Sequence, residues 1–222
     1  MTGTPDYTDM TLDELRVALA PVVAENAVFD GWTDIAVTTA AEMSGVDPDV
    51  ARLAYKGGPM EMIVAWVDSV DAAMAAELPK EKLAEMKIRD RIRTLVLFRL
   101  DAIAGQEEAL RRATAIMAMP QNAPRALKVG WNSADRMWRL AGDTATDYNH
   151  YTKRAILASI YGATLAVFAD DTSDGKADTH AFLDRRIDGI MRFEKAKAQW
   201  TGSDRERFSL TRLLGRLRYP AS

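Results

Sequence analysis

The stretch TDIAVTTAAEMSGVDPDVARLAYKGGP, residues 33–59, decides the fold class. Its apolar residues recur at helical spacing and predict a helix from Thr33 to Met43. A tight turn is expected at Ser44-Gly45-Val46, and a short helix follows that has Pro48 near its first position and reaches about Tyr55. Two short helices joined in this way have the spacing of a helix-turn-helix.

Helical spacing continues on both sides of this stretch. Thr11 and Glu14 form a capping-box pair that opens a first helix, which Pro21 is expected to kink or end early. A fourth helix follows Gly57-Gly58-Pro59 and ends near Leu78, and no segment alternates with period two for long enough to predict a strand. Longer helices are then predicted at residues 82–100, 110–117, 124–141, 151–168 and 179–197. We therefore predict an all-α protein.

Three short helices around a central turn, followed by a bundle of longer helices, are the layout of TetR-type regulators. We predict an acidic helix-turn-helix-like subdomain at residues 1–80, a helical bundle at 81–198, and a basic amphipathic C-terminal helix at 199–222. Residues 1–80 hold 14 Asp/Glu against 4 Lys/Arg, a net charge of −10, whereas the remainder holds 18 acidic against 25 basic residues. Charge divided in this way indicates two surfaces with different partners.

The composition limits the class of protein. With 48% hydrophobic residues among 222, the chain can bury a sizeable core, and the absence of cysteine excludes disulfides and thiolate chemistry. No run approaches the roughly twenty apolar residues that cross a bilayer. The start, MTGTPDYTDM, has neither a basic n-region nor an Arg-rich transit pattern, so we expect a protein that is not exported.

The would-be recognition helix argues against DNA binding. Residues 47–54 carry one Arg against two Asp, and non-specific DNA affinity depends on Lys and Arg that neutralise phosphates. We therefore predict no nucleic-acid partner and a scaffold retained for packing or dimerisation. The alternative is a TetR-like transcriptional regulator with a small-molecule pocket.

Three segments resemble a known family: MPQNAPRAL at 119–127, MWRLAGDTATDYNHYTKRAILASIYGATL at 137–165 and AFLDRRIDGIMRFEKAK at 181–197. They are similar to the lipid-binding accessory proteins of coenzyme Q (ubiquinone) biosynthesis, and the similarity covers nearly all of residues 82–197. The resemblance implies a TetR-like fold whose bundle binds an isoprenoid quinone precursor or a phospholipid. It also implies an auxiliary role, without catalytic residues, beside the di-iron hydroxylase that modifies demethoxyubiquinone.

The resemblance further implies a surface that contacts the hydroxylase. Its residues here are Asp147, Tyr148, Asn149, His150, Tyr151 and Arg154. A Trp is usual in the family where His150 stands, so the large apolar area and single donor of a tryptophan are missing at that position. The alternative interpretation of this segment is a helix start, capped by Asp147 or Asn149.

A lipid cavity follows from the resemblance rather than from periodicity. The chain has 11 Met, and soft thioethers suit a flexible ligand, although ordinary core packing explains the same pattern. If a cavity exists, we expect it between the helices at 124–141 and 151–168. Its predicted lining is Leu127, Trp131, Ile156, Ile160 and Thr164.

The C-terminal segment SDRERFSLTRLLGRLRYP, residues 203–220, has the pattern of an amphipathic helix. Its apolar face and basic flanks are formed by Leu210, Leu213, Leu214 and Leu217 and by Arg212, Arg216 and Arg218. Such a helix suits an anionic bilayer surface, and the alternative is a helix docked on its own bundle or on a dimer mate. The layout resembles the family's terminal membrane-contacting helix, which favours the bilayer.

Catalytic motifs are not found. A di-iron carboxylate bundle needs two Glu-x-x-His motifs, but the only histidines are His150 and His180, preceded three positions earlier by Asp147 and Ala177. We predict no catalytic residue, metal or cofactor, and a homodimeric lipid carrier or presenter. It is expected in the cytoplasm, associated peripherally with the inner membrane.

Overall fold

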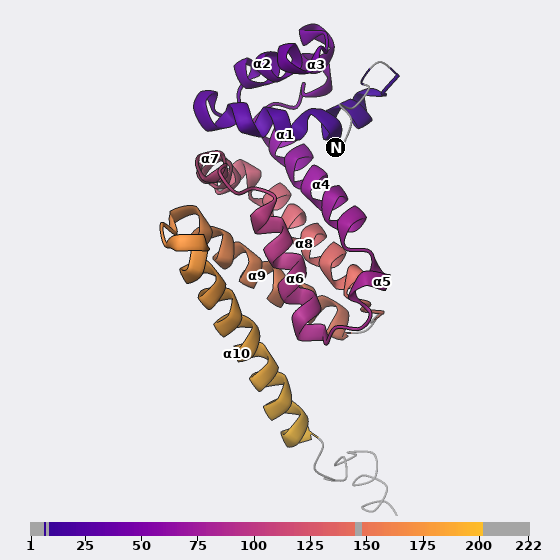
Figure 1. Cartoon of the computed structure of the whole chain (residues 1–222), viewed down its shortest axis with the longest axis vertical. Coiled ribbons are helices and arrows are strands. Elements are labelled where there is room, and N and C mark those ends of the chain that lie inside the picture. Colours follow the sequence, from indigo (N-terminus) through magenta and orange to yellow (C-terminus); the bar gives the residue numbers. More distant parts are fainter. Residues whose placement is uncertain (1–6, 8, 145–147, 202–222) are drawn as a thin grey trace, which may run out of the picture.

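The computed structural model describes residues 7, 9–144 and 148–201, and the elements in these ranges are helices without strands (Figure 1). The helices are α1 (Leu12–Asp30), α2 (Asp34–Ser44), α3 (Pro48–Ala54), α4 (Pro59–Glu77), α5 (Lys80–Leu83), α6 (Ile88–Asp101), α7 (Glu107–Met117), α8 (Ala123–Leu140), α9 (Tyr148–Asp170) and α10 (Ala177–Thr201). The predicted all-α class is confirmed. The predicted C-terminal amphipathic helix lies mostly outside the described residues.

Helix α1 begins at the predicted capping box and continues through its proline. The Thr11 hydroxyl accepts from the Glu14 backbone N–H at 3.4 Å, and the Glu14 carboxylate accepts from the Thr11 N–H at 2.9 Å. Pro21 lies on the exposed side of α1, and the helix runs nine residues further to Asp30. The expected early end does not occur, because the opposite, buried side of α1 packs along its whole length.

The helix-turn-helix forms as the sequence predicts. Gly45 ends α2 with φ 70° and ψ 23°, a left-handed conformation that favours a residue without Cβ. Asp47 then caps α3, since its carboxylate accepts from the Asp49 N–H at 2.7 Å. Pro48 occupies the first turn of α3, where its missing N–H has no partner to lose.

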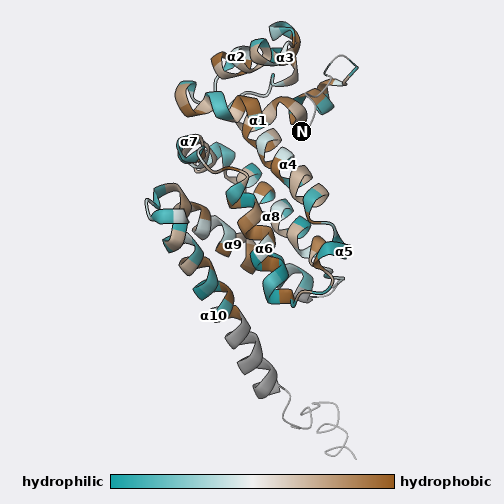
Figure 2. Ribbon diagram, viewed as in Figure 1, coloured by the Kyte–Doolittle hydropathy of each residue, from teal (hydrophilic) through white to brown (hydrophobic). Residues whose placement is uncertain are grey.

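The three-helix subdomain and the bundle share one continuous apolar core. The rings of Trp32 and Trp66 lie 5.3 Å apart, and the indole N–H of Trp32 donates to the Ala109 carbonyl at 3.0 Å. Helix α4 runs from beneath α1 into the bundle, where α6, α7 and α8 pack against it and α9 packs against α7 and α8 (Figure 1). Figure 2 shows apolar residues along α1, α4 and α6, and hydrophilic residues over α5.

A buried ion pair joins the bundle helices. Arg99 of α6 is 1% exposed; it pairs with Asp71 of α4 and donates to the Ser133 hydroxyl of α8 at 3.1 Å. Its guanidinium also lies 4.8 Å from the ring centre of Tyr161 on α9. Arg99 therefore joins its own helix α6 to α4, α8 and α9. Losing Asp71 would leave the guanidinium buried without its ion-pair partner, whereas Asp71 also has Arg136 at 3.8 Å.

Candidate functional site

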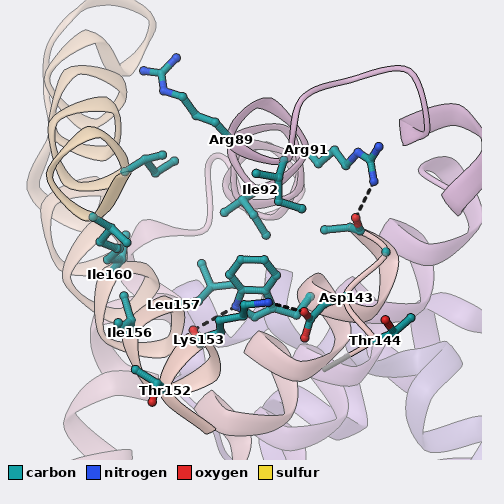
Figure 3. Close-up of a pocket in the computed structure, with 16 residues that line it drawn as sticks. Arg89, Arg91, Ile92, Asp143, Thr144, Thr152, Lys153, Ile156, Leu157 and Ile160 are labelled. Atoms are coloured by element: carbon teal, nitrogen blue, oxygen red, sulfur yellow. Dashed lines mark hydrogen bonds and ion pairs between the residues drawn. The ribbon is translucent and has the colours of Figure 1, made fainter. Parts of the chain in front are cut away.

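A cavity of about 440 Å³ opens between α6, α9 and α10 beside the end of α8 (Figure 3). Its walls are mostly branched aliphatic side chains and one indole: Ile88, Ile92, Trp138, Ile156, Leu157, Ile160, Ile187 and Ile190. The volume falls within the range of roughly 300–1,000 Å³ that is usual for small-ligand sites. Such a lining attracts hydrocarbon by burial and offers few groups to a polar ligand.

The loop between α8 and α9 forms one end of the cavity. Gly142 has φ 91°, and a Cβ there would stand 3.1 Å from a guanidinium nitrogen of Arg91, so glycine is required for two reasons. The guanidinium of Arg91 donates to the carbonyls of Ala141 at 2.7 Å and of Ala84 at 2.6 Å. Arg91 thereby fixes this loop against the start of α6.

Charged groups around the cavity are paired within the protein. Lys153 lies 2.6 Å from Asp143, and Arg89 lies 2.7 Å from Asp188 of α10 with its guanidinium turned away from the cavity centre in Figure 3. Burial would raise the pKa of Asp143, but hydrogen bonds from Lys153 and Arg154 outweigh it and hold the pKa below its usual value. Lys153 and Arg89 are therefore paired with carboxylates, and these ion pairs hold helices together.

Trp138 forms part of the cavity wall and is fixed at one edge and one face of its ring system. Its indole N–H donates to the Lys153 carbonyl at 3.0 Å, and the Lys153 ammonium lies 5.3 Å from the ring centre. The C-terminal end of α8 is in this way attached to the first turns of α9. The apolar face of the indole remains available to the cavity.

The predicted lipid-binding residues divide between two places. Ile156 and Ile160 line the cavity, and Thr164, one turn further along α9, is buried with its hydroxyl bonded to the Ile160 carbonyl at 2.8 Å. Leu127 and Trp131 lie outside the cavity, and Leu127 is 77% exposed. Sequence reasoning missed the contributions of α6 and α10, although their apolar stripes were visible as helical faces.

Leu127 and Trp131 instead lie beside residues predicted to contact the partner. The ring of Trp131 lies 6.0 Å from that of Tyr151 and 6.5 Å from that of His150, and the last two rings are 5.1 Å apart. Leu127 precedes Trp131 by one turn of α8, on the same side of the helix. We call Leu127, Trp131, His150 and Tyr151 the aromatic patch.

The other predicted partner residues are not part of this surface as described. Arg154 is buried, and its guanidinium bonds Asp135 at 2.5 Å, Asp143 at 3.0 Å and the His150 carbonyl at 3.1 Å. It supports the aromatic patch from inside. Asp147 and the side chains of Tyr148 and Asn149 lie outside the described residues, as do the seven predicted membrane-binding residues from Leu210 to Arg218.

The described part of the chain also bears on metal binding and on membrane-spanning helices. Within residues 7, 9–144 and 148–201, no group of three or more His, Cys, Asp or Glu side chains is arranged to hold a metal ion. None of the helices described there is both long and apolar enough to span a bilayer.

Residues 123–194 match the family model described as COQ9. The chain is 32% identical over 203 residues to the rat (Rattus norvegicus) protein named "Ubiquinone biosynthesis protein COQ9, mitochondrial", covering 84% of this chain and 65% of the rat protein. The human (Homo sapiens) protein of that name is 30% identical over 84% of this chain and 64% of its own length. The chain thus spans slightly less than two thirds of these curated relatives.

A solved structure gives the same fold. The crystal structure of the TetR transcriptional regulator from Nitrosomonas europaea ATCC 19718 superposes with a TM-score of 0.62 and 23% identity, covering 79% of this chain and 97% of the regulator. At that identity the likeness concerns the fold alone, and the predicted TetR-like architecture is confirmed.

Proposed function

This chain belongs to the COQ9 family, and on that premise we propose that it is a non-catalytic accessory protein of ubiquinone biosynthesis. It binds an isoprenoid quinone precursor or a phospholipid and presents it to the di-iron demethoxyubiquinone hydroxylase. Its proposed location is the cytoplasmic face of the inner membrane, where it is peripherally bound as a homodimer. The observation that carries the proposal is the apolar cavity between α6, α9 and α10.

The lining supports hydrocarbon as the cargo. Each buried methylene contributes about 0.8 kcal/mol, so a ten-carbon stretch supplies about 8 kcal/mol before the costs of ordering it. The charged groups of the lining already have partners. Lys153 pairs with Asp143, Arg89 pairs with Asp188, and Arg91 donates to backbone carbonyls. A ligand segment without charge therefore fits the cavity without breaking any of these bonds.

The aromatic patch supports a partner contact. Tyr and Trp are enriched at protein interfaces because they offer large apolar area with one polar handle, and Tyr151 is 61% exposed. The rings of Trp131 and Tyr151 provide aromatic area beside His150, where relatives usually carry Trp. The patch and the cavity are built on the same two turns of α9, so cargo and partner would meet close together.

The first test is the cargo itself. Native mass spectrometry and solvent extraction of the purified protein should reveal a co-purified lipid, and Ile160→Trp should lose it because the indole fills the cavity. Leu127→Trp is the matched control, since the same ring is added at an exposed position of the neighbouring helix. Circular dichroism checks that both variants fold. If Ile160→Trp does not fold, Ile187→Trp fills the cavity from α10 instead. A protein that is consistently empty contradicts the proposal.

Membrane contact has its own test. Leu213→Asp and Leu217→Asp together should abolish sedimentation with anionic liposomes, because the charges cannot enter the interface. Unchanged sedimentation would reject the membrane role of this segment.

A TetR-like regulator is the second candidate, supported by the fold of the Nitrosomonas protein. A gel-shift series with duplex DNA at low salt separates the two, since salt-sensitive binding would favour the regulator. A structural adaptor, in contrast, predicts partner binding that stays the same after lipid is stripped.

A further inference from the structure

Three exposed aliphatic side chains lie on the surface where a helix-turn-helix protein meets DNA. Ile35 at the start of α2 is 64% exposed, and Val50 and Leu53 of α3 are 42% and 54% exposed. The guanidinium of Arg52 donates to the Thr38 hydroxyl at 3.1 Å, so the outer sides of α2 and α3 border one surface. In helix-turn-helix proteins the second of these helices enters the major groove. We call this surface the helix-turn-helix face; it comprises Asp34, Ile35, Asp47, Asp49, Val50 and Leu53.

The charges on this face repel a phosphate backbone. Asp34, Asp47 and Asp49 are exposed, and the one cation of α3, Arg52, is paired with Asp49. Residues 17–51 contain six acidic residues and no Lys or Arg. Aliphatic side chains ringed by acids suit a cationic amphipathic helix, whose apolar side covers the former and whose basic side meets the latter.

The chain itself carries a segment of that chemistry. In residues 203–218, Leu210, Leu213, Leu214 and Leu217 recur at helical spacing beside Arg212, Arg216 and Arg218. Residues 195–222 hold seven basic against two acidic residues, opposite in sign to the N-terminal subdomain. Helix α10, which leads to this segment, ends at the far end of the molecule from α1–α3 (Figure 1). A second copy can therefore bring the segment to the helix-turn-helix face.

We propose that the helix-turn-helix face binds residues 203–218 of a second copy of this chain when that segment is not in contact with a bilayer. The leucines cover Ile35, Val50 and Leu53, and the arginines pair with Asp34, Asp47 and Asp49. The contact joins unlike surfaces, so it closes into a dimer only when both copies exchange their segments. The inference does not depend on the cargo of the bundle, and an empty cavity would leave it unaffected.

Site-specific cross-linking tests the contact in the full chain, which has no cysteine of its own. Thr33→Cys adds a thiol in the exposed turn beside the helix-turn-helix face, and Ser209→Cys adds one in the segment. The two variants are mixed, one of them isotopically labelled, and oxidised. We expect mixed cross-linked dimers of one labelled and one unlabelled chain. Gln121→Cys, exposed in the turn before α8, replaces Thr33→Cys as the control and should give few.

A second set of variants asks whether the aliphatic residues hold the contact. Ile35→Ser with Leu53→Ser, in the Thr33→Cys chain, should lower the mixed dimer about tenfold, equivalent to roughly 1.4 kcal/mol of lost contact. Phe29→Ser is the matched control, because Phe29 is 81% exposed but lies outside the helix-turn-helix face, and it should change little. Equal cross-linking with Thr33→Cys and Gln121→Cys would overturn the proposal. So would an equal loss of mixed dimer in the Ile35→Ser, Leu53→Ser variant and in the Phe29→Ser variant. So would binding of duplex DNA by this face.

Discussion

The cavity and the aromatic patch both use residues of α8 and α9, yet their side chains meet different surroundings. Ile160 in the cavity wall is 8% exposed, whereas Leu127 in the aromatic patch is 77% exposed. Both are aliphatic and both lie on amphipathic faces. The difference comes from what covers each face: α6 and α10 cover the cavity side, and no described element covers the patch. Under the proposed function, the covered apolar face would hold cargo and the uncovered one would contact a partner.

Arg154 connects the two regions, and its loss is expected to have the largest effect. Arg154→Ala should lower the free energy of unfolding by about 3 kcal/mol, at the low end for a broken buried ion pair, because Asp135 and Asp143 lose their buried partner and keep only the more exposed Arg139 and Lys153. Urea denaturation measures the change. Arg139→Ala is the control, since Arg139 also pairs with Asp135 but is exposed, and it should cost at most about 1 kcal/mol. Equal losses would mean that Arg154 does not join the two regions.

Truncation of an aliphatic residue should lower the free energy of unfolding in the cavity, by less than the loss of Arg154 does, and should change it little in the aromatic patch. Ile160→Ala is expected to cost about 2 kcal/mol, at the low end for a buried isoleucine because the cavity already leaves one side of it open. Leu127→Ala should stay within about 0.5 kcal/mol, as usual for an exposed residue. Thermal unfolding of the two variants, each with bound lipid removed, makes the measurement. Similar costs would show that the patch is buried against something in solution.

Acid should weaken the cavity side with the smallest effect of the three. The pKa of Asp143 is lowered on folding, so its contribution to stability is complete above the unfolded value near 3.8 and is lost as the pH falls below it. Protonated Asp143 releases Lys153, which lies over Trp138, so tryptophan fluorescence should change in that range. Trp138→Phe or Asp143→Asn should remove this change and Trp131→Phe should keep it. A transition that depends on Trp131 instead would assign the acid response to the aromatic patch.

Local rules in the sequence were sufficient for the elements of the fold. The capping box at Thr11 and Glu14, the turn at Gly45 and the proline in the first turn of α3 act within a few residues, and each appears where it was expected. The early end of the helix expected at Pro21 does not occur. The free-energy cost of a proline inside a helix is offset here by the burial of the opposite side of α1, which is a tertiary property. The confirmed TetR-like layout follows from the order and length of these elements.

The site was less predictable because it depends on which helical faces meet. Ile156 and Ile160 were expected to line a cavity and do line one, but their facing residues come from α6 and α10, far away in the sequence. Periodicity finds an apolar face and does not identify its neighbour. For the same reason Leu127 was grouped with the cavity, whereas Arg154, which is buried, was placed on an exposed surface by the family resemblance.

The contact between the indoles of Trp32 and Trp66 has a consequence for protein engineering. A chimaera that exchanges residues 1–56 for the corresponding three helices of another TetR-like protein would leave the Trp66 ring without its neighbour and the Ala109 carbonyl without its donor. The exchange would expose to solvent an aromatic surface that is buried in this protein. Residues 1–56 of this chain therefore cannot be exchanged as an independent unit. Replacing them requires redesign of the contact between the three-helix subdomain and the bundle on both sides.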